Sequence, residues 1–167
     1  MKVLMVYYSR TGVTKKTTEK IAELLREKAV EVEVVEIVEA KKRTGVLGCL
    51  RTGKDAMRRH AAPIEPVKAD PAAFDLVAIG TPVWAWSVSA PVRTFCQERG
   101  KDAQKLAFYC TMGGTGDKGT FEAMQELCGK APVATLALID RHVRKDHEEK
   151  FVAKARTFAE AIASTGG

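Results

Sequence analysis

Residues 2–25 read KVLMVYYSRTGVTKKTTEKIAELL, and they contain the clearest indication of the fold. The apolar run KVLMVYY (2–8) is short and continuous, as in a strand that is buried on both faces. SRTGVT (9–14) follows it and places three hydroxyl side chains around one glycine. The next residues repeat at helical spacing: Thr17, Ile21, Leu24, Leu25 and Lys28. A strand, a polar loop and an amphipathic helix in this order predict the start of an α/β fold.

The same alternation continues along the chain. Three more buried strands are predicted at residues 76–80, 106–110 and 133–139. Residues 30–35 (VEVEVV) alternate valine with glutamate, which predicts an edge strand with one wet side. Three further helices are indicated by short features of the sequence: Pro91 before Gly100, a stripe of Phe121, Met124 and Leu127 ended by Gly129, and Asp146 three residues before Glu149. The pattern predicts an open, doubly wound five-stranded sheet with helices on both faces.

Length and composition indicate one domain over residues 1–167. The chain has 167 residues and is 46% hydrophobic, enough for a single sizeable core. Its four cysteines stand far apart without a CxxC pair or a histidine at ligand spacing, which predicts reduced thiols and no metal site. The run at the N-terminus is too short for a signal peptide, and no stretch approaches the roughly 20 apolar residues of a membrane span. We therefore expect a cytoplasmic protein.

The positive charge is concentrated in one segment. Residues 41–60 hold seven basic residues and one acidic residue, which matches the net charge of +6 of the whole chain. The remainder is neutral, which is not typical of nucleic-acid binding, so we expect no nucleic-acid partner. We interpret 41–63 as a basic insert after the second strand that packs as a short helix against the sheet edge. The alternatives are a docking patch for an acidic partner, a cofactor phosphate or nucleic acid.

The first loop is suited to a terminal phosphate. Free N–H groups at a helix N-terminus bind anions, and SRTGVT adds hydroxyl donors and a glycine for close approach. The chain lacks the GxGxxG spacing of a dinucleotide loop. GCLRTGKD (48–55) is close to the pattern of a nucleotide-triphosphate loop. However, Asp55 stands where that pattern requires a hydroxyl side chain, and no apolar strand precedes Gly48. A polar turn that only caps a helix remains the alternative for the first loop alone.

Two further loops follow predicted strands at the same edge of the sheet. GTPVWAWSVSAP (80–91) offers a hydroxyl, a proline and two tryptophans, and CTMGGTGDKGT (110–120) offers small residues with exposed N–H groups. Such loops can enclose a flat amphipathic ring, with an indole against one face and main-chain donors at its edge. Together the three loops predict a site for a planar ring that carries a phosphate.

These segments resemble a known family. YYSRTGVTKKTTEKIAELL, IGTPVWAWSVSAP and TMGGTGDKGTFEAM are similar to the three FMN-binding loops of the flavodoxin family, in the same order and spacing. The resemblance implies a flavodoxin-like fold with strand order 2-1-3-4-5, bound FMN, and one- or two-electron redox chemistry. The short connection from Ile139 to Asp146 is similar to that of the short-chain form.

The resemblance also implies which residues hold FMN. The phosphate is expected on Ser9, Arg10, Thr11, Gly12, Val13 and Thr14. The ring is expected between two further groups: Thr81, Pro82, Val83, Trp84, Ala85 and Trp86, and Thr111, Met112, Gly113, Gly114, Thr115 and Gly116. Val13 stands where the family often has Asn, and Met112 where it often has a stacking Tyr. Of the two tryptophans, we expect Trp84 to contact the flavin.

Two functions are compatible with these residues. The first is an electron carrier that shuttles electrons between redox partner proteins, which are expected to be acidic because the chain is basic. The alternative is an FMN-dependent oxidoreductase that takes electrons from NAD(P)H and reduces a quinone or another small acceptor. The three histidines share no face, and Cys110 is interpreted as a buried small hydrophobe, so no catalytic residue is predicted.

Overall fold

The computed structural model describes residues 1–40, 61–146 and 148–166. The strands are β1 (Lys2–Tyr7), β2 (Glu31–Glu36), β3 (Leu76–Trp84), β4 (Ser87–Val88), β5 (Leu106–Met112) and β6 (Ala134–Ile139). The helices are α1 (Val13–Arg26), α3 (Ala90–Arg99), α4 (Asp117–Cys128) and α5 (Glu148–Ala163). Short helical turns are η1 (Pro71–Ala73), η2 (Gly100–Asp102), η3 (His142–Asp146) and η4 (Ser164–Gly166). Residues 41–60 of the predicted basic insert, with the short helix expected there, lie outside the described residues.

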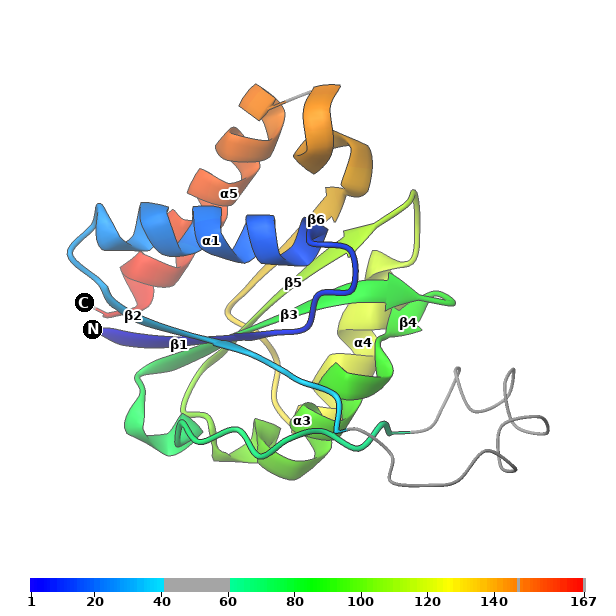
Figure 1. The fold of residues 1–167 in the computed structure, drawn as a ribbon. Coiled ribbons are helices and arrows are strands. Elements are labelled where there is room, and N and C mark those ends of the chain that lie inside the picture. The colour runs from blue at the N-terminus through cyan, green and yellow to red at the C-terminus, as the bar shows by residue number, and fades with distance from the viewer. Residues whose placement is uncertain (41–60, 147, 167) are drawn as a thin grey trace.

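Five strands form a parallel sheet in the order β2-β1-β3-β5-β6 (Figure 1). Counted along the chain without β4, this order is 2-1-3-4-5, so the predicted fold and topology are confirmed. β2 lies at the edge and presents its glutamates to solvent, as its alternating pattern predicts.

The prediction of a loop directly after the third strand was wrong. β3 continues to Trp84. Ser87 and Val88 form β4, a short strand in addition to the five parallel ones, which pairs antiparallel with the end of β3. The two-residue turn between them places Ala85 at φ 49° and Trp86 at φ 60°. Such turns usually carry Asn or Gly, because Gly has no Cβ to clash at positive φ and Asn can offset the clash with a local hydrogen bond. Ala-Trp therefore did not indicate a hairpin.

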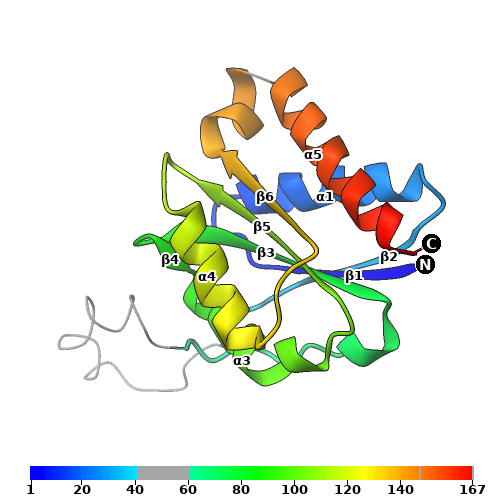
Figure 2. The same cartoon turned by 180° about the vertical axis from the view of Figure 1, so that it is seen from behind.

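Helices cover both faces of the sheet. α1 and α5 lie on one face, and α3 and α4 lie on the other, as Figures 1 and 2 show from opposite sides. The central strands contribute to both apolar cores, which explains their continuous apolar runs. No helix among the described residues has the length and apolar character needed to cross a bilayer.

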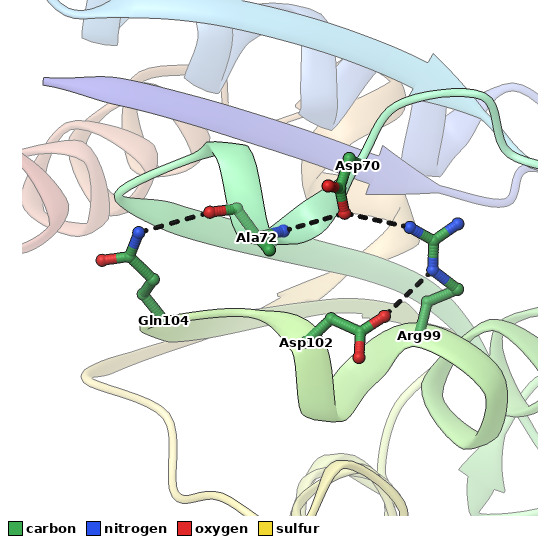
Figure 3. Close-up of polar contacts among 5 residues, drawn as sticks. All are labelled: Asp70, Ala72, Arg99, Asp102 and Gln104. Carbon is green, nitrogen blue, oxygen red and sulfur yellow. Dashed lines mark hydrogen bonds and ion pairs between the residues drawn. The ribbon is translucent and has the colours of Figure 1, made fainter.

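A polar network joins the segments that lead into the amino ends of β3 and β5 (Figure 3). Asp70 Oδ1 accepts hydrogen bonds from the Ala72 N–H and from the Arg99 guanidinium, each at 3.2 Å. Arg99 Nε donates to Asp102 Oδ2 at 3.1 Å, and Gln104 Nε2 donates to the Ala72 carbonyl at 3.3 Å. These contacts hold the end of the sheet opposite to the three predicted binding loops.

Buried hydroxyls connect α1 to β5 beneath the first loop. The Thr14 and Thr111 hydroxyls lie 2.9 Å apart, and the Thr18 and Tyr109 hydroxyls lie 2.8 Å apart. Thr18 Oγ1 also lies 2.8 Å from the Thr14 carbonyl, within hydrogen-bonding distance. Because buried polar groups are costly to leave unpaired, these contacts specify how the start of α1 lies on the sheet.

One buried hydroxyl in the same helix lacks a partner. Thr17 is fully buried, and its Oγ1 has no hydrogen-bond partner among the described residues. We expect Thr17→Val to stabilise the protein by about 1 kcal/mol, because it replaces an unpaired buried hydroxyl with a methyl group of similar size. Urea unfolding measures the change.

Thr18→Val is the matched control for this prediction. It removes a buried hydroxyl that is paired with Tyr109, and it should destabilise the protein by about 1–3 kcal/mol. Equal destabilisation by the two substitutions would contradict the difference in pairing.

Candidate functional site

The three predicted binding loops meet at the carboxyl edge of the sheet. Gly80 of β3 is the register partner of Tyr7 in β1 and of Tyr109 in β5. The loops that follow these strands are therefore neighbours, on the side where ligands bind in doubly wound sheets. They are the first loop (8–12), the β3–β4 hairpin (81–88) and the β5–α4 loop (113–116).

The first loop is held by the Ser9 side chain. Ser9 Oγ accepts hydrogen bonds from the N–H groups of Gly12 at 3.1 Å and Lys15 at 3.2 Å. Gly12 is the N-cap of α1, with φ 83°, and a Cβ added there would meet no atom within 4 Å. The first-turn N–H groups of Val13 and Thr14 have no earlier carbonyl in the helix to bond. The loop therefore combines main-chain donors with open space.

The side chains of this loop and of the first turn of α1 have different surroundings. Val13 and Thr14 are buried, and the Thr14 hydroxyl lies against Thr111, so these two residues offer main-chain donors to a ligand at the surface. Thr11 is exposed, and its Oγ1 accepts a hydrogen bond of 3.3 Å from the Arg144 guanidinium. Arg10 lies over the Trp84 ring, with its guanidinium carbon 5.8 Å from the ring centroid.

The hairpin directs its two indoles differently. Trp84 is half-buried and packs edge-on against Tyr8 of the first loop, with ring centroids 5.6 Å apart at an angle of 88°. Trp86 at the tip is 66% exposed. Thr81 is fully buried, and its hydroxyl bonds to Ser89, the N-cap residue of α3 directly after the hairpin. The exposed ring available to a flat ligand at the hairpin tip is therefore that of Trp86.

Two glycines at the start of α4 allow the hairpin to approach closely. A Cβ on Gly116 would lie 2.8 Å from Val83 Cγ1 and 3.0 Å from Trp86 Cα. A Cβ on Gly119 would lie 3.0 Å from the Trp86 carbonyl oxygen. Gly116 also has φ 116°, a backbone conformation that residues with a side chain rarely adopt. These positions hold the tip of the hairpin against α4.

The β5–α4 loop leaves open space next to the hairpin. Gly113 and Gly114 are exposed, and a Cβ added to either would meet no atom within 4 Å. Thr115 is exposed, whereas Met112 is 8% exposed and closes the end of β5. Main-chain donors and free space at the first and third loops, with an exposed indole at the hairpin, fit a planar ring that carries a phosphate.

Two titratable groups near the edge keep their protons at neutral pH. Burial raises the pKa of the Cys110 thiol to about 12, with smaller contributions from Asp117 and Asp140. Burial and the hydrogen bond to Glu39 raise the pKa of Tyr8 to about 12. A protonated, buried thiol is a poor nucleophile, which agrees with the interpretation of Cys110 as a small hydrophobe.

The structure brings three residues to this edge that the sequence did not indicate. Tyr8 contacts Trp84, and Arg144 contacts Thr11. Asp140 follows β6, and its buried Oδ1 has no partner among the described residues. Tyr8 directly precedes the predicted loop, so its position was the one local signal. Asp140 and Arg144 lie more than a hundred residues further along the chain.

Residues 1–128 match the model of a family described as NADPH-dependent FMN reductase. A flavoprotein of Lactobacillus acidophilus, solved in complex with FMN, is 24% identical; the match covers 85% of this chain and 95% of that chain, with a TM-score of 0.62. Flavodoxin 1 of Bacillus cereus is 17% identical over 98% of both chains, with a TM-score of 0.64. No curated protein matches the chain. The two structures share its fold.

Proposed function

Because this chain belongs to the NADPH-dependent FMN reductase family, we propose that it is an FMN-dependent oxidoreductase that transfers electrons from NAD(P)H to a small acceptor such as a quinone. FMN is its cofactor, and the protein is a flavodoxin-like flavoprotein. The observation that carries the proposal is the extent of the family match, which spans all three loops at the carboxyl edge. We expect the protein to act in the cytoplasm.

We place the FMN phosphate on the first loop. Ser9 fixes the loop through its bonds from the Gly12 and Lys15 N–H groups, the N–H groups of Val13 and Thr14 face the anion, and the exposed Thr11 hydroxyl adds a donor. Charge-assisted hydrogen bonds of this kind are about twice as strong as neutral ones. The phosphate therefore anchors the cofactor at the end of α1.

We place the ring between the hairpin and the β5–α4 loop. The exposed Trp86 ring provides an apolar surface, and the main chain at Gly113 and Gly114 provides donors at the opposite loop. FMN bound there supplies the ability to accept and release one or two electrons. The protein orients the ring and limits its contact with water on the covered side.

A second candidate function is an electron carrier between redox proteins. The exposure of Trp86 favours it, because an aromatic side chain at the tip of a projecting hairpin suits contact with a partner protein. In that case the partner meets the protein at the hairpin, and the basic residues 41–60 would favour an acidic partner.

Anaerobic mixing with NADPH or NADH separates the two functions. We expect the FMN-loaded protein to lose its flavin absorbance rapidly after mixing, and to regain it when a quinone is added. The measurement is stopped-flow absorbance with one equivalent of FMN per chain. Reduction by dithionite but not by either nicotinamide over minutes would instead favour the carrier.

A further inference from the structure

The first loop receives a cation from a distant part of the chain. Arg144 lies in η3, a single π-helical turn between β6 and α5, and its guanidinium donates to Thr11 Oγ1 at 3.3 Å. The Lys16 ammonium of α1 donates to the Val143 carbonyl at 2.8 Å and so ties this turn to the helix that follows the loop. Single π-turns inside helical segments occur frequently at functional sites.

Arg10, the basic residue of the first loop itself, is directed away from the Thr11 hydroxyl. Arg10 lies over the Trp84 ring, on the hairpin side of the loop. Arg144 instead lies at the Thr11 hydroxyl, next to the N-terminus of α1, where the N–H groups of Val13 and Thr14 have no earlier carbonyl in the helix to bond. The family match ends at residue 128, so Arg144 lies outside the part of the chain that it covers.

The contact with Thr11 uses few of the hydrogen-bond donors of the Arg144 guanidinium. One bond of 3.3 Å to a neutral hydroxyl occupies one of five N–H donors, whereas the planar fork of arginine matches two oxygens of a phosphate. The charge of Arg144 also opposes the rise in the pKa of the Asp140 carboxyl that burial causes.

We propose that Arg144 is a phosphate-binding residue of the FMN site, supplied by η3 and not by any of the three loops. Its guanidinium donates to phosphate oxygens beside Thr11 in the loaded protein, and the Lys16–Val143 contact positions the turn that carries it. This inference rests on the proposed function, because it requires FMN with its phosphate on the first loop.

The test compares Arg144→Gln with Arg141→Gln. Arg141 precedes the same turn, and its exposed side chain makes no hydrogen bond or ion pair with another described residue, so its substitution removes the same charge without the contact. Affinities for FMN and for riboflavin, which lacks the phosphate, are measured by flavin fluorescence at low and high salt. Thermal unfolding of the flavin-free variants verifies that they fold.

We expect Arg144→Gln to weaken FMN binding roughly tenfold, since the contact is exposed and partly screened, and to leave riboflavin binding unchanged. Arg144→Lys should lose less, and Arg141→Gln should change FMN binding less than twofold. The salt dependence of FMN binding should fall in Arg144→Gln. Equal losses for both flavins, or none for FMN, would overturn the role of Arg144 while the proposed function stands. Failure of the unaltered protein to bind FMN would overturn both.

Discussion

Gly80→Ala is expected to destabilise the protein by about 3 kcal/mol or more. A Cβ at this position would lie 2.2 Å from Tyr109 Cζ and 2.5 Å from its hydroxyl oxygen. Tyr109 is fully buried, and its hydroxyl bonds to Thr18, so its ring has little room to move. The expected loss combines overpacking of about 1–3 kcal/mol with the disturbance of a buried hydrogen bond. Urea unfolding of the flavin-free protein measures it.

Gly113→Ala is the matched control for this substitution. A Cβ on Gly113 would meet no atom within 4 Å, so its stability should change by less than about 0.5 kcal/mol. Tyr109→Leu removes the end of the ring that the new Cβ would strike, so Gly80→Ala should cost less in a Tyr109→Leu background than in the unaltered protein. Equal losses of stability in Gly80→Ala and Gly113→Ala would contradict the expected clash between the new Cβ and the Tyr109 ring.

The second large effect is expected from the pair Thr11→Ala and Thr14→Ala. Thr11 presents a hydroxyl at the surface, and Thr14 joins the first turn of α1 to Thr111 on β5. Losing a donor to a charged group costs about 1.5–3 kcal/mol, and losing the buried contact displaces the N–H groups that face the phosphate. Together the substitutions should weaken FMN binding by about 100-fold or more.

Riboflavin separates a phosphate effect from a general loss of the site. The double variant should bind riboflavin nearly as well as the unaltered protein, because the hairpin and the β5–α4 loop are untouched. Thr157→Ala, an exposed threonine of α5, serves as the control variant and should leave both affinities unchanged. Unaltered FMN binding in the double variant would show that the phosphate does not lie on the first loop.

Local patterns in the sequence predicted the strands of the parallel sheet and the place of the three loops, and the resemblance to the flavodoxin family supplied the strand order. A strand buried on both faces needs a continuous apolar run, and β1, β3 and β5 each have one. The glycine and hydroxyl residues of the first loop directly follow such a run. Both features depend on neighbours in the chain, so a local pattern was enough to predict them.

The backbone conformation and packing of the loops could be determined only from the tertiary structure. The turn at Ala85 and Trp86 adopts positive φ without Asn or Gly, and the close contacts of the hairpin with Gly116 and Gly119 accompany it. The sequence favoured Trp84 as the ring that meets the flavin, and this stays a prediction; the structure adds that Trp84 packs edge-on against Tyr8 and that Trp86 is exposed. Packing between segments decided these conformations against local preference.

The Arg144 contact belongs entirely to the tertiary structure. Arg144 and Thr11 are separated by 133 positions, and they meet because β6 lies beside β5 and because η3 lies against α1. No residue near either one in the chain specifies that encounter. The sequence could predict a phosphate loop from its own residues, whereas the cation that reaches this loop depends on how the sheet and its helices close around it.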